Sequence, residues 1–311
     1  DDDYVRRFAA LVRDTLDPRL KAHVEYSNEV WNFIFEQAHW ARAQATEMWG
    51  EAGDGWVQFY GMRAAQVMDI WTGVFGDAAD DRLVRIVATQ TGWLGLEEAI
   101  LTAPLWYAST GRRPVESFDA YAVTGYFGLD LSDEDRVAEV NGWLDMAEAQ
   151  AEREGRAAGL TRVALRDYIE THRFDAAVEP LARALRQGSL TRLIGDLWPY
   201  QAAVANEAGL RLLMYEGGTH VAPLGPLTRD ERLSDFVVHF NYTPEVAALY
   251  ESLLAGWVAS GGTLFNAFVD VAPATRWGSW GALRHLDARN PRWDILAAFN
   301  ATGPTDWEDR D

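Results

Sequence analysis

The stretch HVEYSNEVWN, residues 23–32, contains the first unit from which the fold can be inferred. A short apolar run ends near Ser27 and helical composition resumes soon afterwards, so we expect a strand over residues 20–26 and a helix over residues 30–49. Upstream, apolar side chains recur at helical spacing behind acidic residues over residues 3–16. This pattern predicts a helix before the first strand.

The same strand-then-helix unit recurs along the rest of the chain. Four further runs read as strands: residues 83–89, 118–124, 210–215 and 263–271. Long stretches of helical composition lie between them, at residues 131–188 and 243–259. Such alternation predicts a parallel sheet built from βα units. No repeat or low-complexity linker divides the chain, so we expect residues 1–311 to form one domain.

Composition narrows the classes of function. The chain has 311 residues, 48% of them hydrophobic, which is enough for a large core. Its formal net charge of -19 disfavours nucleic acid and anionic membranes as partners. No apolar run is long enough for a membrane span, and the absence of cysteine excludes disulfides and thiolate ligands. A neutral or weakly charged substrate fits this composition better.

The sequence carries no recognisable metal or cofactor motif. Its six histidines lack ligand spacing, no Asp-rich calcium loop occurs, and Gly217-Gly218 is not part of a phosphate-binding loop. We therefore expect neither a metal nor a cofactor. The chain begins at Asp1 without Met or a signal segment, which indicates a mature or trimmed form, and we expect it outside the cell or in the periplasm.

Two glutamates stand where predicted strands end. Glu29 follows the first predicted strand, and Glu216 ends the fourth within LLMYEGGTH, residues 212–220. Because the carboxyl ends of parallel strands share one edge of the sheet, both side chains should reach the opening that forms at this edge. One carboxyl group can protonate a glycosidic oxygen while the other attacks the anomeric carbon. The pair therefore predicts cleavage of a glycosidic bond.

Other polar and aromatic residues follow the same strand ends. They are Asn28 and Trp31 after the first strand, Gln90 and Trp93 after the second, Tyr126 after the third, His220 after the fourth, and Trp277 and Trp280 after the fifth. Aromatic faces stack on the C–H surfaces of sugar rings. We therefore predict that these residues bind a carbohydrate substrate.

At these residues the sequence resembles a known group. Asn28-Glu29 and Glu216 look like the two signatures of glycoside hydrolase clan A, whose members are retaining (β/α)8 barrels of the TIM type. The clan's Asn-Glu pair ends strand four and its second glutamate ends strand seven, which is the three-strand offset expected here. The sequences EYSNEVWN and RWGSWG, residues 25–32 and 276–281, are similar to those of a poorly characterised bacterial group in that clan. Members of this group are often encoded with carbohydrate-binding modules.

The resemblance covers roughly residues 20–285 and implies an incomplete barrel. A barrel needs about 30 residues for each βα unit, so strands one to three do not fit before the first predicted strand. The arginine that the clan carries on strand two is absent with them. We expect an α/β, TIM-type barrel represented by strands four to eight, with long helical insertions. The missing strands would come from a preceding segment or another chain, or the barrel is not complete.

The resemblance also implies a role for each site residue. Glu29 would be the general acid and base, Glu216 the nucleophile, Asn28 a ligand of the sugar 2-hydroxyl, and Tyr126 a hydrogen-bond donor to the nucleophile. Retention requires carboxyl groups about 5 to 5.5 Å apart. Three alternatives remain: Glu29 could be a favourable charge in the first turn of a helix, the tryptophans could belong to the core, and the fold could serve a non-catalytic carbohydrate-binding protein.

Overall fold

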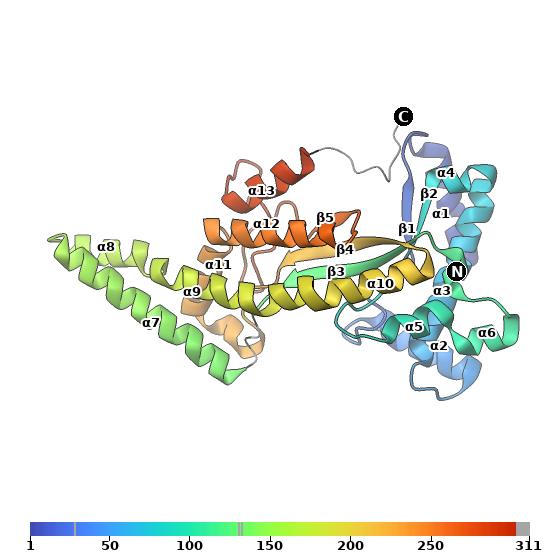
Figure 1. Cartoon of the computed structure of the whole chain (residues 1–311), viewed down its shortest axis with the longest axis horizontal. Coiled ribbons are helices and arrows are strands. Elements are labelled where there is room, and N and C mark those ends of the chain that lie inside the picture. The colour runs from blue at the N-terminus through green and yellow to red at the C-terminus, as the bar shows by residue number, and fades with distance from the viewer. Residues whose placement is uncertain (28, 130, 132, 303–311) are drawn as a thin grey trace.

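The computed structural model describes residues 1–27, 29–129, 131 and 133–302, and its centre is one parallel sheet. Five strands pair in the order β1-β2-β3-β4-β5 within these residues. They are β1 Ala22–Glu25, β2 Leu83–Ala88, β3 Ala120–Phe127, β4 Arg211–Thr219 and β5 Phe265–Ala267. The sheet curls, so that the direction of β1 and β2 differs clearly from that of β3 and β4 (Figure 1). The predicted βα organisation is confirmed as a parallel half-barrel, whereas the described residues form no complete eight-stranded barrel.

Helices enclose this half-barrel. In chain order they are α1 Asp2–Thr15, α2 Glu36–Trp49, α3 Gly55–Phe75, α4 Ala79–Arg82, α5 Leu96–Thr102, α6 Pro104–Thr110, α7 Glu134–Ala157, α8 Arg162–His172, α9 Asp175–Leu185, α10 Trp198–Ala208, α11 Glu231–Phe240, α12 Pro244–Ala259 and α13 Pro291–Asn300. Helix α3 packs against α1, α2 and α5, whereas α10 lies along β3 and β4. Helices α10 and α12 flank the half of the sheet that contains β3, β4 and β5 (Figure 1).

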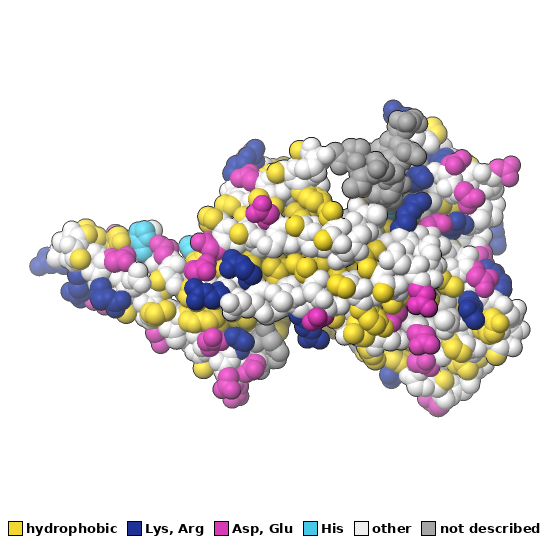
Figure 2. All heavy atoms as spheres, viewed as in Figure 1, with side chains coloured by type: hydrophobic (Ala, Val, Ile, Leu, Met, Phe, Trp, Pro, Cys, Tyr) yellow, Lys and Arg dark blue, Asp and Glu magenta, His cyan; other side chains and the backbone are white. Residues whose placement is uncertain are grey.

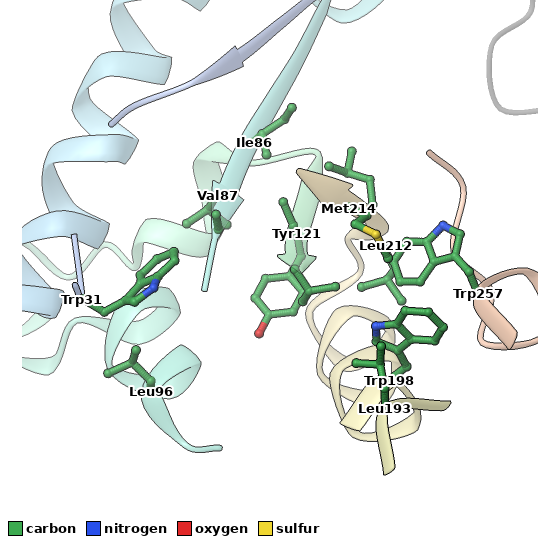
Figure 3. Packing of buried hydrophobic residues seen from close by; sticks show 14 of the residues in the cluster. Trp31, Ile86, Val87, Leu96, Tyr121, Leu193, Trp198, Leu212, Met214 and Trp257 are labelled. Atoms are coloured by element: carbon green, nitrogen blue, oxygen red, sulfur yellow. The ribbon is translucent and has the colours of Figure 1, made fainter. Parts of the chain in front are cut away.

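The strands are held by a core that continues on both sides of the sheet. In β3, Tyr121, Ala122 and Val123 are all fully buried, as expected for a parallel strand covered on both faces. On the α10 side the Trp198 and Trp257 rings lie 5.1 Å apart, beside Met214 (Figure 3). This packing fixes the strand ends from which the candidate site residues extend.

The predicted helical segment 131–188 is divided in the structure. Helices α7 and α8 pack on each other and form an arm that projects from the body, and α9 returns the chain to it (Figure 1). Asp133 caps the start of α7, because its side chain accepts hydrogen bonds from the backbone N–H groups of Asp135 and Arg136. The arm carries side chains of both charge signs, whereas hydrophobic side chains gather between α10 and α12 (Figure 2).

Strand β1 is an edge strand, and a hollow of about 760 Å³ lies beside it. We call it the edge groove. Residues of α1, α2, α3 and β1 line it, and most of the lining is apolar. Tyr4, Phe8, Trp40 and Met48 are exposed there, and no described strand covers them. Among the described helices, none combines the length and apolar character that crossing a bilayer requires.

Candidate active site

Glu216 lies within β4, not beyond its end as the sequence predicts. The pairing of β3 with β4 runs from Val123 opposite Met214 to Thr124 opposite Glu216, which leaves Tyr215 as an extra residue on β4. The pairing of β4 with β5 shifts over the same residues. Such a β-bulge redirects the side chains beside it and is frequent near active sites. The bulge therefore sets the direction in which Glu216 leaves the sheet.

The two glycines after Glu216 continue β4 and serve the backbone packing of the strand. Gly217 is opposite Gly125 on β3, and a Cβ atom on Gly217 would lie 3.0 Å from the Gly125 Cα. Gly218 has a φ of +134°, and a Cβ atom there would lie 2.5 Å from the Tyr250 hydroxyl oxygen. That oxygen accepts a 2.9 Å hydrogen bond from the Thr219 N–H, which ties α12 to the end of β4.

An aromatic cluster stands beside Glu216. The Tyr126 hydroxyl on β3 acts on the Glu216 carboxylate as a donor and lowers its pKa. The Tyr126 ring lies 5.7 Å from His220 and 6.2 Å from Trp280, and the Trp280 ring lies 5.9 Å from Phe268. Burial lowers the pKa of His220, which favours the neutral imidazole. The fold therefore gathers Tyr126, His220 and Trp280, which come from three different strand ends.

Glu29 reaches the site from the segment after β1. The predicted helix over residues 30–49 begins only at Glu36, so Glu29 does not occupy the first turn of a helix. Its backbone has a φ of 49°, and its carbonyl accepts a 2.9 Å hydrogen bond from the Asn32 N–H, which closes a tight turn. The Asn32 side-chain amide also donates a 2.9 Å hydrogen bond to Glu29 Oε2. Asn32 therefore orients the carboxylate.

A pocket of about 630 Å³ opens in front of Glu29. We call it the mouth pocket. It is lined by Glu29, Trp31, Asn32, Gln90, Gly92, Trp93 and Leu94. Trp93 is 49% exposed and offers a ring face to solvent, whereas Trp31 is 6% exposed and packs between Tyr60 and Tyr215. Trp31 is thus mainly a core residue that also forms part of the pocket wall.

Electrostatic coupling links the two glutamates. Burial raises the pKa of Glu216, and the negative charge of Glu29 raises it further, whereas the hydrogen bond from Tyr126 opposes both effects. The pKa of Tyr126 is also raised, by burial first and then by the charges of Glu216 and Glu29. The charge of Glu29 therefore reaches both Glu216 and Tyr126.

A third carboxyl group, Glu25, stands behind this pair. It ends β1, and its Oε1 atom is buried with no hydrogen-bond partner among the described residues. Burial, followed by the charge of Glu216, raises the pKa of Glu25 to about 7. Sequence reasoning did not assign Glu25 or Asn32, although both belong to the HVEYSNEVWN stretch. The signal that points to Glu25 is an acidic residue inside a short run that otherwise reads as a buried strand.

The remaining predicted site residues have different outcomes. Gln90 and Trp93 line the mouth pocket as the strand-end argument suggests. Trp277 is 59% exposed, and its ring is covered by the Arg276 guanidinium at 4.7 Å, whereas Trp280 is the tryptophan that joins the aromatic cluster. Asn28 lies outside the described residues. No group of three or more His, Asp or Glu side chains in the described part of the chain could hold a metal ion.

No protein-family model, no curated protein and no solved structure matches this chain.

Proposed function

We propose that this protein is a retaining glycoside hydrolase that acts on a carbohydrate with neutral or weakly charged units. The observation that carries the proposal is the coupled pair of carboxylates: Glu29 lines the mouth pocket, and its charge raises the pKa of Glu216 on β4, although the two residues lie far apart in the sequence. Sugar-binding surfaces beside such a pair are the second support. Trp93 on one side and the Tyr126, His220 and Trp280 cluster on the other provide them.

The roles combine the resemblance with these contacts. Burial and the charge of Glu29 raise the pKa of Glu216 overall, and Tyr126 is the neighbour that opposes this shift and would help to keep Glu216 ionised, as a nucleophile requires. In the first step Glu216 would bond to the anomeric carbon while Glu29 gives its proton to the departing glycosidic oxygen. In the second step Glu29 would take a proton from water, whose oxygen displaces Glu216 from the sugar. Asn32 would keep the Glu29 carboxyl aimed into the mouth pocket.

The test uses Glu216→Gln and Glu29→Gln, with Glu207→Gln, at an exposed position of α10, as a matched control. Hydrolysis is measured on nitrophenyl and dinitrophenyl glycosides of neutral sugars and on dyed neutral polysaccharides. We expect Glu216→Gln to lower kcat at least about a thousand-fold. Glu29→Gln should still release dinitrophenol, because that leaving group needs no proton, and azide should then restore turnover. Glu207→Gln should behave as the wild type.

Two further readouts identify the nucleophile and the stereochemistry. A 2-fluoro-glycosyl fluoride should leave its sugar on the peptide that contains Glu216, as found by mass spectrometry. Proton NMR of the first product should show the anomer of the substrate. A label elsewhere, an inverted product, or an active Glu216→Gln protein would contradict the proposed mechanism.

A non-catalytic carbohydrate-binding protein is the second candidate. It is favoured by the open edge of the sheet at β1, because a barrel wall that normally encloses a glycosidase site is missing from the described residues. Calorimetric titration separates the two candidates. Sugar binding without hydrolysis by the wild type, and unchanged binding in both glutamine variants, would favour this second function.

A further inference from the structure

A second hollow lies next to the mouth pocket and has no role in the proposed reaction. We call it the outer pocket. It has a volume of about 410 Å³ and is lined by Arg42, Ala45, Thr46, Gly50, Glu51, Ala52, Gly53 and Trp56. These residues come from the second half of α2, the turn after it and the start of α3. The outer pocket is therefore built on two helices that the core holds in place.

A continuous aromatic surface connects the two pockets. Trp93 lines the mouth pocket, and its ring lies 6.1 Å from that of Trp56, which lines the outer pocket. The Phe33 ring lies 5.6 Å from Trp56 and stands in the same segment as Glu29, between β1 and α2. The Trp56 ring is partly buried and inclined by 50° to that of Trp93, so the two rings provide neighbouring surfaces for successive sugar rings. A chain that leaves the mouth pocket along Trp93 would thus be led to Trp56.

The polar side chains of the outer pocket suit sugar hydroxyls. Arg42 can only donate hydrogen bonds and an ionised Glu51 can only accept them, whereas each sugar hydroxyl does both. Arg42 is held over the Phe33 ring, with its guanidinium carbon 4.2 Å from the ring centroid. A sugar carboxylate is disfavoured because Glu51 faces the same hollow and the whole chain has a net charge of -19. The lining therefore fits a neutral sugar unit.

We infer that the outer pocket is a distal subsite, which binds a neutral sugar unit of the same polysaccharide chain whose bond is cleaved at the mouth pocket. This inference rests on the proposed function and extends it to a class of substrate. The protein then acts on linear chains of several units, bound along α2 and α3, rather than on a single terminal sugar. Affinity and kcat/KM both increase with chain length until the outer pocket is filled.

The experiment measures binding and hydrolysis of neutral oligosaccharides of two to six units. The probes are gluco-, xylo- and manno-oligosaccharides, with galacturonate oligomers as acidic comparators. Binding is measured by calorimetry in the Glu216→Gln background, so that it does not depend on turnover. Trp56→Ala should weaken binding of the six-unit chain about ten-fold and leave the two-unit chain unchanged. Arg42→Ala and Glu51→Gln, at exposed positions that do not threaten folding, should act in the same direction.

Trp40→Ala is the matched control. Trp40 is an exposed tryptophan on the same helix α2, but it faces the edge groove. It should weaken neither the long nor the short chain. Equal affinities of Trp56→Ala and Trp40→Ala for the six-unit chain would overturn the subsite, as would preferred binding of galacturonate.

The outcomes separate the subsite from the proposed function. Length-dependent binding that Trp56→Ala abolishes, in a wild type that hydrolyses nothing, would support the subsite and overturn the hydrolase. Hydrolysis with no dependence on length beyond two units would overturn the subsite alone. If no oligosaccharide of the panel binds, both are overturned.

Discussion

The edge groove and the mouth pocket are lined by successive parts of the segment that begins with β1, residues 22–26 and residues 29–32, and they differ in kind. The edge groove is the larger hollow, yet its walls are mostly apolar side chains from α1, α2 and α3. The mouth pocket is smaller and combines Glu29, Asn32 and Gln90 with tryptophan rings. A hollow at the side of a sheet is a core surface without its covering layer, whereas a hollow at the strand ends collects polar groups from several βα loops. Size alone therefore does not identify the functional site.

Glu25 belongs to both regions. Its carboxyl group lines the edge groove, whereas the charge of Glu216, in the candidate active site, contributes to its raised pKa. A change at Glu25 is thus the most direct way to test how separate the two regions are.

The largest expected effect is on stability, from Glu25→Gln. The pKa of Glu25 is about 7 in the folded protein, above its ordinary value of 4.5, so the folded state binds the proton more tightly than the unfolded state. Wild-type stability should therefore fall as the pH rises from about 4.5 to 7. Glu25→Gln removes this loss and should raise the free energy of unfolding by roughly 2 to 3 kcal/mol at pH 8 relative to the wild type.

Urea unfolding at pH 4.5 and pH 8 checks this expectation, with Glu207→Gln as the control. The difference between Glu25→Gln and the wild type should be present at pH 8 and nearly absent at pH 4.5. An equal difference at both pH values would mean that Glu25 is not a buried carboxyl of raised pKa.

The second effect, on activity, should come from Tyr126→Phe. This variant removes the hydrogen bond to Glu216, a contact to a charged group that is worth about 1.5 to 3 kcal/mol. We expect kcat/KM on an aryl glycoside to fall roughly ten- to hundred-fold. Because the lost bond lowers the pKa of Glu216, the acidic limb of the pH profile should move to higher pH.

Tyr4→Phe in the edge groove is the matched change for this comparison. Tyr4 is 66% exposed, and its ring stacks on Phe8 rather than on any residue of the mouth pocket. It should leave both kcat/KM and the pH profile unchanged. A similar loss in the two variants would show that the edge groove and the mouth pocket function as one site.

The smallest effect should appear in the binding of a hydrophobic fluorescent dye. Trp40→Lys places a charge in the edge groove and should weaken dye binding by about 1 kcal/mol, or about five-fold. Trp93→Lys makes the same change at the mouth pocket, where polar side chains already stand, and should leave dye binding nearly unchanged. Fluorescence titration of both variants measures the contrast, which would disappear if the two hollows were equally apolar.

The order and direction of the strands could be predicted from sequence, because each buried run is bounded by turn residues and separated by helical composition. Details set by tertiary packing could not. Gly217-Gly218 is typical of a loop, yet both glycines continue β4 because Gly125 and Tyr250 approach too closely for any side chain. The helix predicted from residue 30 starts at Glu36, since the chain first makes the Glu29–Asn32 turn.

Only those residues of the candidate site that directly follow a strand could be predicted from the sequence. Glu29, Gln90 and Trp93 meet in the mouth pocket because parallel strands bring their following loops to one edge. The contribution of Trp56 could not be inferred, because it lies on α3 and joins the site through its contacts with Trp93 and Phe33. Trp277 and Trp280 both follow the fifth predicted strand, so the sequence cannot show that only Trp280 joins the aromatic cluster.

The bulge at Tyr215 also constrains how this sequence can change during evolution. Side chains alternate between the two faces of a strand, so loss of one residue from β4 would reverse the facing of those that follow it. Glu216 would then take the direction of Tyr215, and Gly217 and Gly218 would no longer stand where Gly125 and Tyr250 require glycine. Glu216, Gly217 and Gly218 each depend on this register, so we expect descendants of this chain to keep both the number of residues between Met214 and Thr219 and these three identities, whereas Tyr215 can change.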